Sequence, residues 1–117
     1  GPKHMRSDGD CYEASGKYIM DECMFGDDCK LLLVHGEVSG QGTLEGLTYG
    51  HAWVLDGDLV IDRSNGRFLE MPKQLYYTLG QIDHIDNMYV YSWKEARQKI
   101  LEFEHWGPWD LETGSGL

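Results

Sequence analysis

The chain has 117 residues, with 20 Asp and Glu against 10 Lys and Arg, and a formal net charge of −10 at pH 7. This length supports one hydrophobic core rather than two, so we expect a single domain. The negative charge argues against direct nucleic-acid binding, because Lys and Arg must replace the counterions of the phosphate backbone. No apolar run approaches the ~20 residues of a membrane span, so no membrane partner is expected.

The two ends of the chain are expected to lie outside the folded domain. Residues 1–8 have the character of a cloning remnant and a flexible start, with the natural chain beginning at Met5. The domain is predicted for residues 9–109, and the polar, Gly-rich residues 110–117 are predicted to form a flexible tail. An odd number of Cys, three in all, and a start without an apolar stretch indicate reduced thiols and a cytoplasmic protein.

The first predicted element is a helix over residues 11–24, with Asp8 or Asp10 as its N-cap and residues 26–28 as its end. Its apolar residues recur at helical spacing. They are Ala14, Tyr18, Ile19 and Cys23. A strand follows at residues 31–38, whose apolar run is typical of a central strand covered on both faces. Residues 36–50 are predicted to form a long, Gly-rich loop.

The clearest local signal is a β-hairpin, with strands predicted at residues 49–55 and 58–63. The intervening Asp56-Gly57 favours a type I′ turn. If these two residues form the loop, Leu55 faces Asp58 and His51 faces Asp62, so an imidazole and a carboxylate lie side by side. A three-residue loop breaks this pairing, whereas a four-residue loop preserves it.

The second half of the chain predicts a short strand at residues 68–71, a short helix from Pro72 to residue 79 and a strand at residues 87–91. Ser92 and Glu95 form a capping box that opens a helix to about residue 105. The predicted buried face of that helix carries Trp93, Ala96, Ile100 and Phe103. Together the elements predict an α+β fold, with an N-terminal helix carrying a Cys packed on a small antiparallel sheet and a C-terminal helix.

Cys11, His51 and Asp62 are the candidate catalytic residues. A thiol at the start of a helix sits where the helix dipole and the free N–H groups favour the thiolate, which is the nucleophilic form. His51 then acts as general base or imidazolium partner, and Asp62 holds its ring in one tautomer. The alternative is a His and an Asp that pair only across two strands. For Cys23 and Cys29 we expect the role of inert apolar residues.

The motifs Gly9-Asp10-Cys11-Tyr12, Tyr49-Gly50-His51-Ala52-Trp53-Val54 and Val60-Ile61-Asp62 resemble the transglutaminase-like branch of the papain-like cysteine enzymes. The His-Ala-Trp-Val run is also similar to the leader peptidases of lasso-peptide biosynthesis, and the whole chain is similar to short uncharacterised phage proteins. The resemblance covers residues 9–66. It implies a helix packed on a small antiparallel sheet, and a Cys-His-Asp triad for acyl transfer or amide hydrolysis.

The resemblance leaves the oxyanion hole unassigned, because residues 5–10 lack the Gln that papain-like peptidases carry before the nucleophile. The backbone N–H of Cys11 is one candidate donor. Gln41 and Tyr49 are side-chain candidates, and Tyr12 is a further candidate contact for substrate. Trp53 shares a strand face with His51, where it either covers the imidazole or fills the core.

No cofactor and no metal site is predicted. His35 lies inside a predicted strand and is interpreted as a satisfied core or surface histidine. Residues 83–86, Asp-His-Ile-Asp, fit no familiar zinc or calcium spacing.

The sequence therefore predicts a small cysteine hydrolase or acyltransferase that acts on an amide, ester or isopeptide bond through a thioester on Cys11. Its substrate would be a peptide, a protein or a small amide or ester. An alternative hypothesis is a non-catalytic interaction protein, such as a phage inhibitor, that binds a basic partner through acidic residues such as Asp27, Asp28 and Glu102. A third is a small-molecule binding module in which residues 36–50 close over a ligand.

Overall fold

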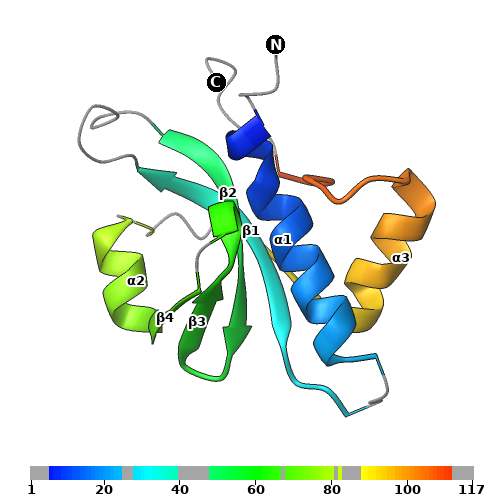
Figure 1. Cartoon of the computed structure of the whole chain (residues 1–117), viewed down its shortest axis with the longest axis horizontal. Coiled ribbons are helices and arrows are strands. Elements are labelled where there is room, and N and C mark those ends of the chain that lie inside the picture. Colours follow the sequence, from blue (N-terminus) through cyan, green and yellow to red (C-terminus); the bar gives the residue numbers. More distant parts are fainter. Residues whose placement is uncertain are drawn as a thin grey trace.

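A five-stranded antiparallel sheet organises the fold, with the strands in the order β4-β3-β2-β1-β5 (Figure 1). The computed structural model describes residues 6–24, 28–39, 48–66, 68–80, 82 and 88–111. The predicted α+β class, with a Cys-bearing helix near the N-terminus and a helix near the C-terminus, is confirmed. The elements are α1 (Arg6–Glu22), β1 (Leu32–Ser39), β2 (Thr48–Asp56), β3 (Leu59–Asp62), the 3-10 helix η3 (Ser64–Gly66), β4 (Leu69–Pro72), α2 (Lys73–Leu79), β5 (Met88–Ser92) and α3 (Trp93–Phe103).

Helices cover both faces of the sheet, and each face has its own apolar cluster. α1 and α3 lie on one face and α2 lies on the other (Figure 1). Because strand side chains alternate between faces, this arrangement requires apolar residues at consecutive positions of the central strands. The buried residues of the first cluster are Ile19, Cys23, Leu33, Val54, Ile61, Tyr91 and Ala96. Those of the second are Val34, Val38, Trp53, Leu55, Val60 and Ile82, with Tyr76 and Tyr77 of α2 packed against them.

β1 meets this requirement as its sequence predicts. It lies between β2 and β5 in the sheet. Leu33 and Val34 are consecutive and both fully buried, one in the cluster under α1 and α3 and the other in the cluster under α2. The predicted central strand covered on both faces is therefore confirmed.

The loop predicted for residues 36–50 is too long at both ends. β1 continues to Ser39, and β2 begins at Thr48. The glycines in this stretch favoured a loop, but sheet pairing includes Gly36 and Gly50. Residues 40–47, which include the candidate Gln41, lie outside the described part of the chain.

α1 begins at Arg6, so the predicted N-cap residues Asp8 and Asp10 lie inside the helix. Cys11 is its sixth residue, and the Cys11 N–H belongs to the helical hydrogen-bond ladder. The prediction of a thiol at the helix N-terminus is therefore wrong, and residues from Arg6 onward do not form a flexible start. Asp and Gly disfavour helix interiors by only about 1 kcal/mol or less, so tertiary packing can outweigh that preference.

The buried side of α1 also differs in part from the predicted stripe. Ile19 and Cys23 are fully buried as predicted, whereas Ala14 and Tyr18 are only half-buried. Toward the N-terminal end, the buried positions are Cys11, Tyr12, Ser15 and Gly16. The candidate nucleophile thus lies on the packed side of the helix.

β2 and β3 form the predicted hairpin with a different register. The observed pairs are Val54 with Ile61, Leu55 with Val60 and Asp56 with Leu59. The two loop residues are consequently Gly57 and Asp58, and Gly57 has a φ of 64°. A Gly at the first loop position is typical of a type II′ turn, whereas a loop of Asp56-Gly57 calls for a type I′ turn. The predicted direct pairs, Leu55 with Asp58 and His51 with Asp62, are therefore wrong.

The elements after the hairpin follow the predicted order with small shifts at their ends. Ser92 and Glu95 form the predicted capping box at the start of α3. α3 ends at Phe103, before the predicted residue 105, because Glu104 adopts a left-handed conformation with a φ of 61°. Phe103 is 44% exposed, so its predicted burial is wrong. None of the described helices is both long and apolar enough to cross a membrane.

Residues 104–111, which we call the C-terminal strap, run from the end of α3 back toward α1 (Figure 1). Trp106 of the strap packs against Gly16 of α1, where a Cβ atom would lie 2.6 Å from the indole ring. Asp110 accepts a hydrogen bond at 2.7 Å from the Tyr91 hydroxyl of β5. The flexible tail predicted for residues 110–117 therefore does not begin at Asp110.

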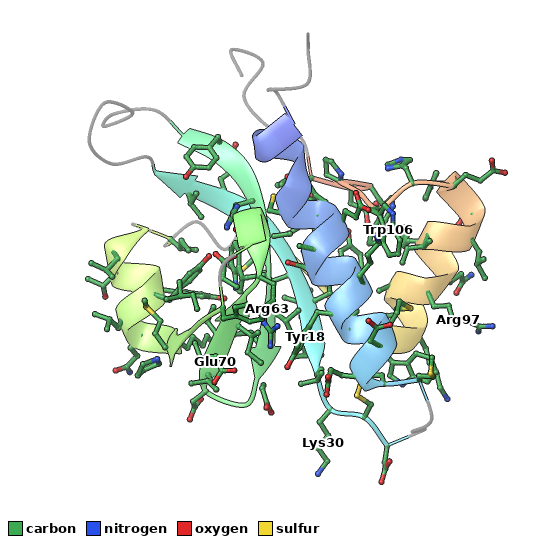
Figure 2. The ribbon with its side chains drawn as sticks, in the orientation of Figure 1. Tyr18, Lys30, Arg63, Glu70, Arg97 and Trp106 are labelled. Carbon is green, nitrogen blue, oxygen red and sulfur yellow. A yellow bond between two sulfur atoms is a disulfide. The ribbon has the colours of Figure 1, made fainter. Side chains whose placement is uncertain are left out.

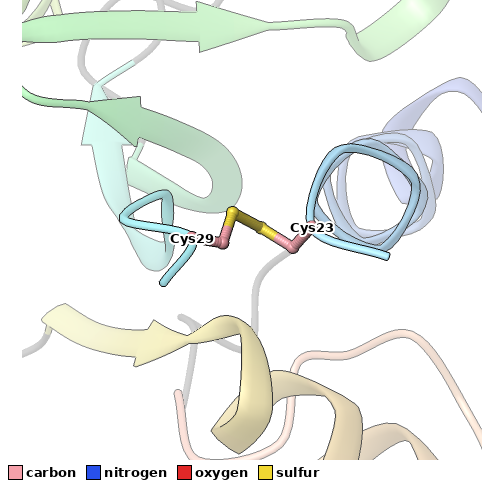
Figure 3. The surroundings of a disulfide bond; sticks show 2 residues. All are labelled: Cys23 and Cys29. Carbon is pink, nitrogen blue, oxygen red and sulfur yellow. A yellow bond between two sulfur atoms is a disulfide. The ribbon is translucent and has the colours of Figure 1, made fainter. Parts of the chain in front are cut away.

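Cys23 and Cys29 form a disulfide that joins the end of α1 to the segment leading into β1 (Figure 3). Their Cα atoms are 5.4 Å apart, a usual distance for such a bond. The predictions that Cys23 and Cys29 are reduced and serve only as inert apolar residues are therefore wrong, and Cys11 is the cysteine outside the disulfide. Disulfides persist mainly in oxidising compartments, so this bond does not favour the predicted cytoplasmic location.

His35 is fully buried beneath the C-terminal strap. Its ring lies 4.9 Å from that of Tyr12, 5.2 Å from that of Tyr91 and 4.8 Å from that of Trp109, measured between centroids. Neither ring nitrogen has a hydrogen-bond partner in the described part of the chain. His35 is therefore a core histidine as predicted, but not a satisfied one. Burial lowers the pKa of His35 to about 3, against an opposing effect of the Asp110 carboxylate.

We expect His35 to make the protein less stable in acid. The unfolded chain binds a proton at this position near pH 6.5, and the folded chain does so only near pH 3. The stability that neutral His35 contributes is thus fully present above about pH 6.5 and is lost as the pH falls toward about 3. Each pH unit in that window costs up to about 1.4 kcal/mol of the free energy of unfolding. In urea titrations at several pH values, His35→Leu should flatten this dependence, and an unchanged slope would assign it to other groups.

Candidate active site

Asp62, the last residue of β3, is 1% exposed and is held by hydrogen bonds to both carboxylate oxygens. Oδ1 accepts from the backbone N–H of Ser64 at 2.9 Å and from its hydroxyl at 2.6 Å. Oδ2 accepts from the Tyr76 hydroxyl at 2.8 Å and lies 3.1 Å from Nε2 of His51. Burying a carboxylate is costly unless it is paired and hydrogen-bonded, so these donors fix both its position and its charge.

The structure brings His51 and Asp62 together although they are not directly opposed in the sheet. The observed register, continued along β3, places Trp53 opposite Asp62. His51 precedes Trp53 by two residues on the same face of β2, so it is the diagonal neighbour of Asp62. The predicted and observed registers differ by two residues, and a shift of that size keeps every side chain on its face. The predicted contact between His51 and Asp62 is therefore present, but it joins diagonal neighbours rather than directly opposed residues.

Cys11 reaches this pair from α1. β3 ends at Asp62, so the part of β2 before Trp53 has no β3 neighbour, and His51 lies along this open edge. The His51 imidazole hydrogen-bonds the Cys11 side chain. Because Nε2 is engaged by Asp62, Nδ1 is the ring nitrogen left to face the thiol. The three candidate catalytic residues thus form one chain of contacts from α1 through β2 to β3.

These contacts also set the protonation of the pair. Burial alone lowers the pKa of His51, but hydrogen bonds to Asp62 and Cys11, together with their negative charges, raise it to about 9. Burial alone raises the pKa of Asp62, but the hydrogen bonds from His51 and Ser64 and the imidazolium charge hold it well below its usual range. At neutral pH, His51 is therefore protonated and Asp62 is ionised.

Ser64 and Tyr76 are parts of the site that sequence analysis missed. Ser64 follows Asp62 by two residues, the spacing at which an Asp side chain commonly binds its own backbone, so a local signal was present. Tyr76 comes from α2, and its ring packs 5.6 Å from the Trp53 ring. No local pattern connects Tyr76 with Asp62, because their contact depends on how α2 packs on the sheet.

Arg63 holds the segment between β3 and η3 against α1 (Figure 2). Its guanidinium lies 4.8 Å from the Tyr18 ring of α1 and 4.5 Å from the Phe68 ring. Cation–π contacts of this kind contribute about 0.5–1 kcal/mol each at exposed sites. Since Arg63 stands between Asp62 and Ser64, these contacts connect the segment that carries the carboxylate to α1.

Two aromatic rings flank His51. The Trp53 ring lies 6.0 Å from the imidazole with an interplanar angle of 30°, and the Tyr49 ring lies 6.3 Å from it. Trp53 is fully buried, and its indole N–H donates to the Tyr77 hydroxyl at 3.3 Å. Trp53 therefore fills the core and also lies beside the imidazole, so the two predicted alternatives for it are not exclusive.

The structure narrows the candidates for an oxyanion donor. The backbone N–H of Cys11 is engaged in the α1 ladder, so its predicted role as a free donor is wrong. Gln41 lies outside the described residues. Tyr49 remains a candidate beside His51, and Tyr12 remains a candidate in the buried cluster that contains Cys11.

Across the described ranges, no group of three or more His, Cys, Asp and Glu side chains could hold a metal ion. Residues 83–86, whose spacing fits no familiar zinc or calcium pattern, lie outside those ranges.

Comparison with protein-family models, with curated proteins and with solved structures finds no match for the chain. A functional proposal therefore rests on the contact chain of Cys11, His51 and Asp62 and on the elements that hold it.

Asp62→Asn is expected to lower the pKa of His51 from about 9 by about one to three pH units, because the hydrogen bond to a charged carboxylate is lost. NMR titration of the imidazole signals, assigned with a His51 variant, measures this change. Tyr76→Phe is the matched control, since it removes a donor to Asp62 and leaves the carboxylate, so the His51 pKa should stay raised. An unchanged His51 pKa in Asp62→Asn would assign the effect to Cys11 instead.

Proposed function

We propose that the protein is a small cysteine hydrolase or acyltransferase that acts on an amide, ester or isopeptide bond, in the manner of the transglutaminase-like, papain-like cysteine enzymes. The observation that carries this proposal is the contact chain from the Cys11 thiol through the His51 imidazole to the Asp62 carboxylate. A nucleophile, a base and a group that orients the base are the essential parts of a covalent acyl-transfer site.

In the proposed reaction, the Cys11 sulfur attacks the carbonyl carbon of the substrate as a thiolate and forms a tetrahedral intermediate. The bond to the leaving group then breaks, His51 gives its proton to the leaving amine or alcohol, and a thioester remains on Cys11. Water or an amine attacks the thioester carbon next, His51 takes up the proton of the attacking group, and the thiolate is released. Hydrolysis and transfer differ only in the attacking group.

Asp62 supports this sequence by binding Nε2, which orients the ring with Nδ1 toward Cys11. Its charge also stabilises the imidazolium before the proton is given away. The Cys11 residue is 2% exposed, so the reaction requires a local opening at the thiol. A small, activated acyl compound is therefore a suitable first substrate.

The contact between Cys11 and His51 favours this function over the interaction-protein alternative. An inhibitor that binds a basic partner through acidic residues such as Asp28 and Glu102, both exposed, has no use for a thiol hydrogen-bonded to an imidazole. Asp27, the other residue considered for that role, lies outside the described residues. The small-molecule alternative depends mainly on residues 40–47, which lie outside them too.

Reaction with p-nitrophenyl acetate tests the proposal. We expect a burst of nitrophenol and an acetyl group on Cys11, located by peptide mass spectrometry. Cys11→Ser should abolish the Cys11 adduct, and His51→Ala should slow acylation by about a hundredfold, the lower range for loss of a general acid–base group. Asp62→Asn should slow it less, because the imidazole itself is retained.

Asp58→Asn is the control for Asp62→Asn, since Asp58 is an exposed carboxylate in the hairpin loop and its change alters the net charge equally. Cys11 of the Asp58→Asn variant should be acylated at the same rate as Cys11 of the unmodified protein. Acetylation of lysine residues without labelling of Cys11, or a His51→Ala variant that reacts at the full rate, would refute the proposed function.

A further inference from the structure

Glu37 places a carboxylate near the proposed nucleophile, and the proposed reaction does not use it. Glu37 follows His35 by two residues on β1, so the two side chains share the face of the sheet that α1 covers. The Tyr12 ring of α1 packs on the His35 ring at 4.9 Å. Tyr12 directly follows Cys11 in the helix. Glu37, Tyr12 and Cys11 therefore belong to one neighbourhood.

The positions of β2 in this neighbourhood carry the smallest side chains. Gly50 is the sheet partner of Glu37, and Ala52 is the partner of His35. Ala52 is fully buried in a cluster with Cys11 and Tyr12. On the other side of β1, the pairing with β5 ends one residue before Glu37 in the described part of the chain. Glu37 is accordingly half-buried, at the margin of the packed cluster.

Glu37 makes no ion pair or hydrogen bond within the described ranges, and the Tyr12 hydroxyl makes none there either. Tyr12 is 7% exposed, so most of its side chain lies inside the packed cluster. Burial and the negative charges of Cys11 and Glu37 raise the pKa of Tyr12, which keeps the phenol neutral. A carboxylate and a phenol oxygen, both able to accept hydrogen bonds, are suited to bind an ammonium or guanidinium group.

We infer that Glu37, assisted by the Tyr12 hydroxyl, binds a positively charged group of the substrate beside the bond that Cys11 attacks. The substrate class is therefore an acyl compound that carries an amine or a guanidinium, such as a lysine or arginine residue or a free N-terminal amine. The net charge of −10 attracts such compounds at longer range. This inference rests on the proposed function, because it assigns the specificity of the same site.

Three iodoacetamide derivatives of similar size, carrying a positive, a neutral or a negative group, test the inference. In each, the Cys11 sulfur forms a bond to the methylene carbon and iodide leaves. Rates are normalised to those of a small free thiol. We expect the cationic reagent to label Cys11 about three to five times faster than the neutral one, as one partly exposed ion pair allows. Glu37→Gln should remove this preference, and Glu37→Lys should reverse it in favour of the anionic reagent.

Glu13→Gln is the matched control, because Glu13 is an exposed carboxylate on the same helix, paired with Lys17 at 2.7 Å. Its preference for the cationic reagent should equal that of the unmodified protein. Equal normalised rates for all three reagents, or the same loss in Glu13→Gln as in Glu37→Gln, would overturn the inference. The proposed function is judged separately, by the dependence of acetylation on Cys11 and His51.

Esters of acetyl-lysine, glycine and acetyl-glycine extend the test to acyl substrates. The first carries a side-chain amine, the second a free N-terminal amine, and the third no cation. Faster acylation of Cys11 by either cationic ester, lost in Glu37→Gln, supports the inference and identifies the source of the charge. Equal acylation by all three esters contradicts it.

Discussion

The structure around the site depends on keeping the Asp62 carboxylate charged inside the protein. A buried carboxylate that loses its donors is strongly destabilising, so the elements that supply those donors must keep their relative positions. These elements are η3 through Ser64, α2 through Tyr76 and β2 through His51. The same interaction that stabilises Asp62 therefore orients the imidazole. His51 stabilises the buried Asp62 carboxylate and is also part of the candidate site. The stability of the fold and the geometry of the site therefore depend on the same hydrogen bond.

The sequence predicted those features of the fold that depend on the alternation of side chains along a strand or on interactions between residues close in the chain. The apolar run of β1 predicted a strand covered on both faces, and the pair of Ser92 and Glu95 predicted the start of α3, because each signal lies within a few residues. The His51–Asp62 contact was predicted with the wrong register and is nevertheless present. A register shift of two residues leaves every side chain on the same face of the sheet. The alternation of residues in the sequence therefore predicts which side chains share a face more reliably than it predicts which residues are directly opposed.

Features that depend on contacts between distant elements could not be predicted in this way. The Tyr76 donor requires the packing of α2. The burial of the His35 nitrogens, which have no partner among the described residues, requires the strap that covers them. The early start of α1 is a tertiary effect as well, because Asp and Gly within Arg6–Asp10 argue locally against a helix. The disulfide of Cys23 and Cys29 depends on the approach of two chain segments. In each case the local preference is weak, and packing determines the outcome.

The members of the contact chain are held by different kinds of interaction. His51 and Asp62 are fixed by hydrogen bonds within the sheet and from η3 and α2, whereas the position of Cys11 follows from how α1 packs. Helix packing is determined by side-chain volume, and α1 approaches the sheet and the strap at the small residues Ala52 and Gly16. Arg63 couples the two parts, because it contacts Tyr18 of α1 while it stands between Asp62 and Ser64. The separation of thiol and imidazole therefore depends on how α1 packs on the sheet and the strap, and the electrostatics of the His51–Asp62 pair can act on Cys11 only while that packing holds.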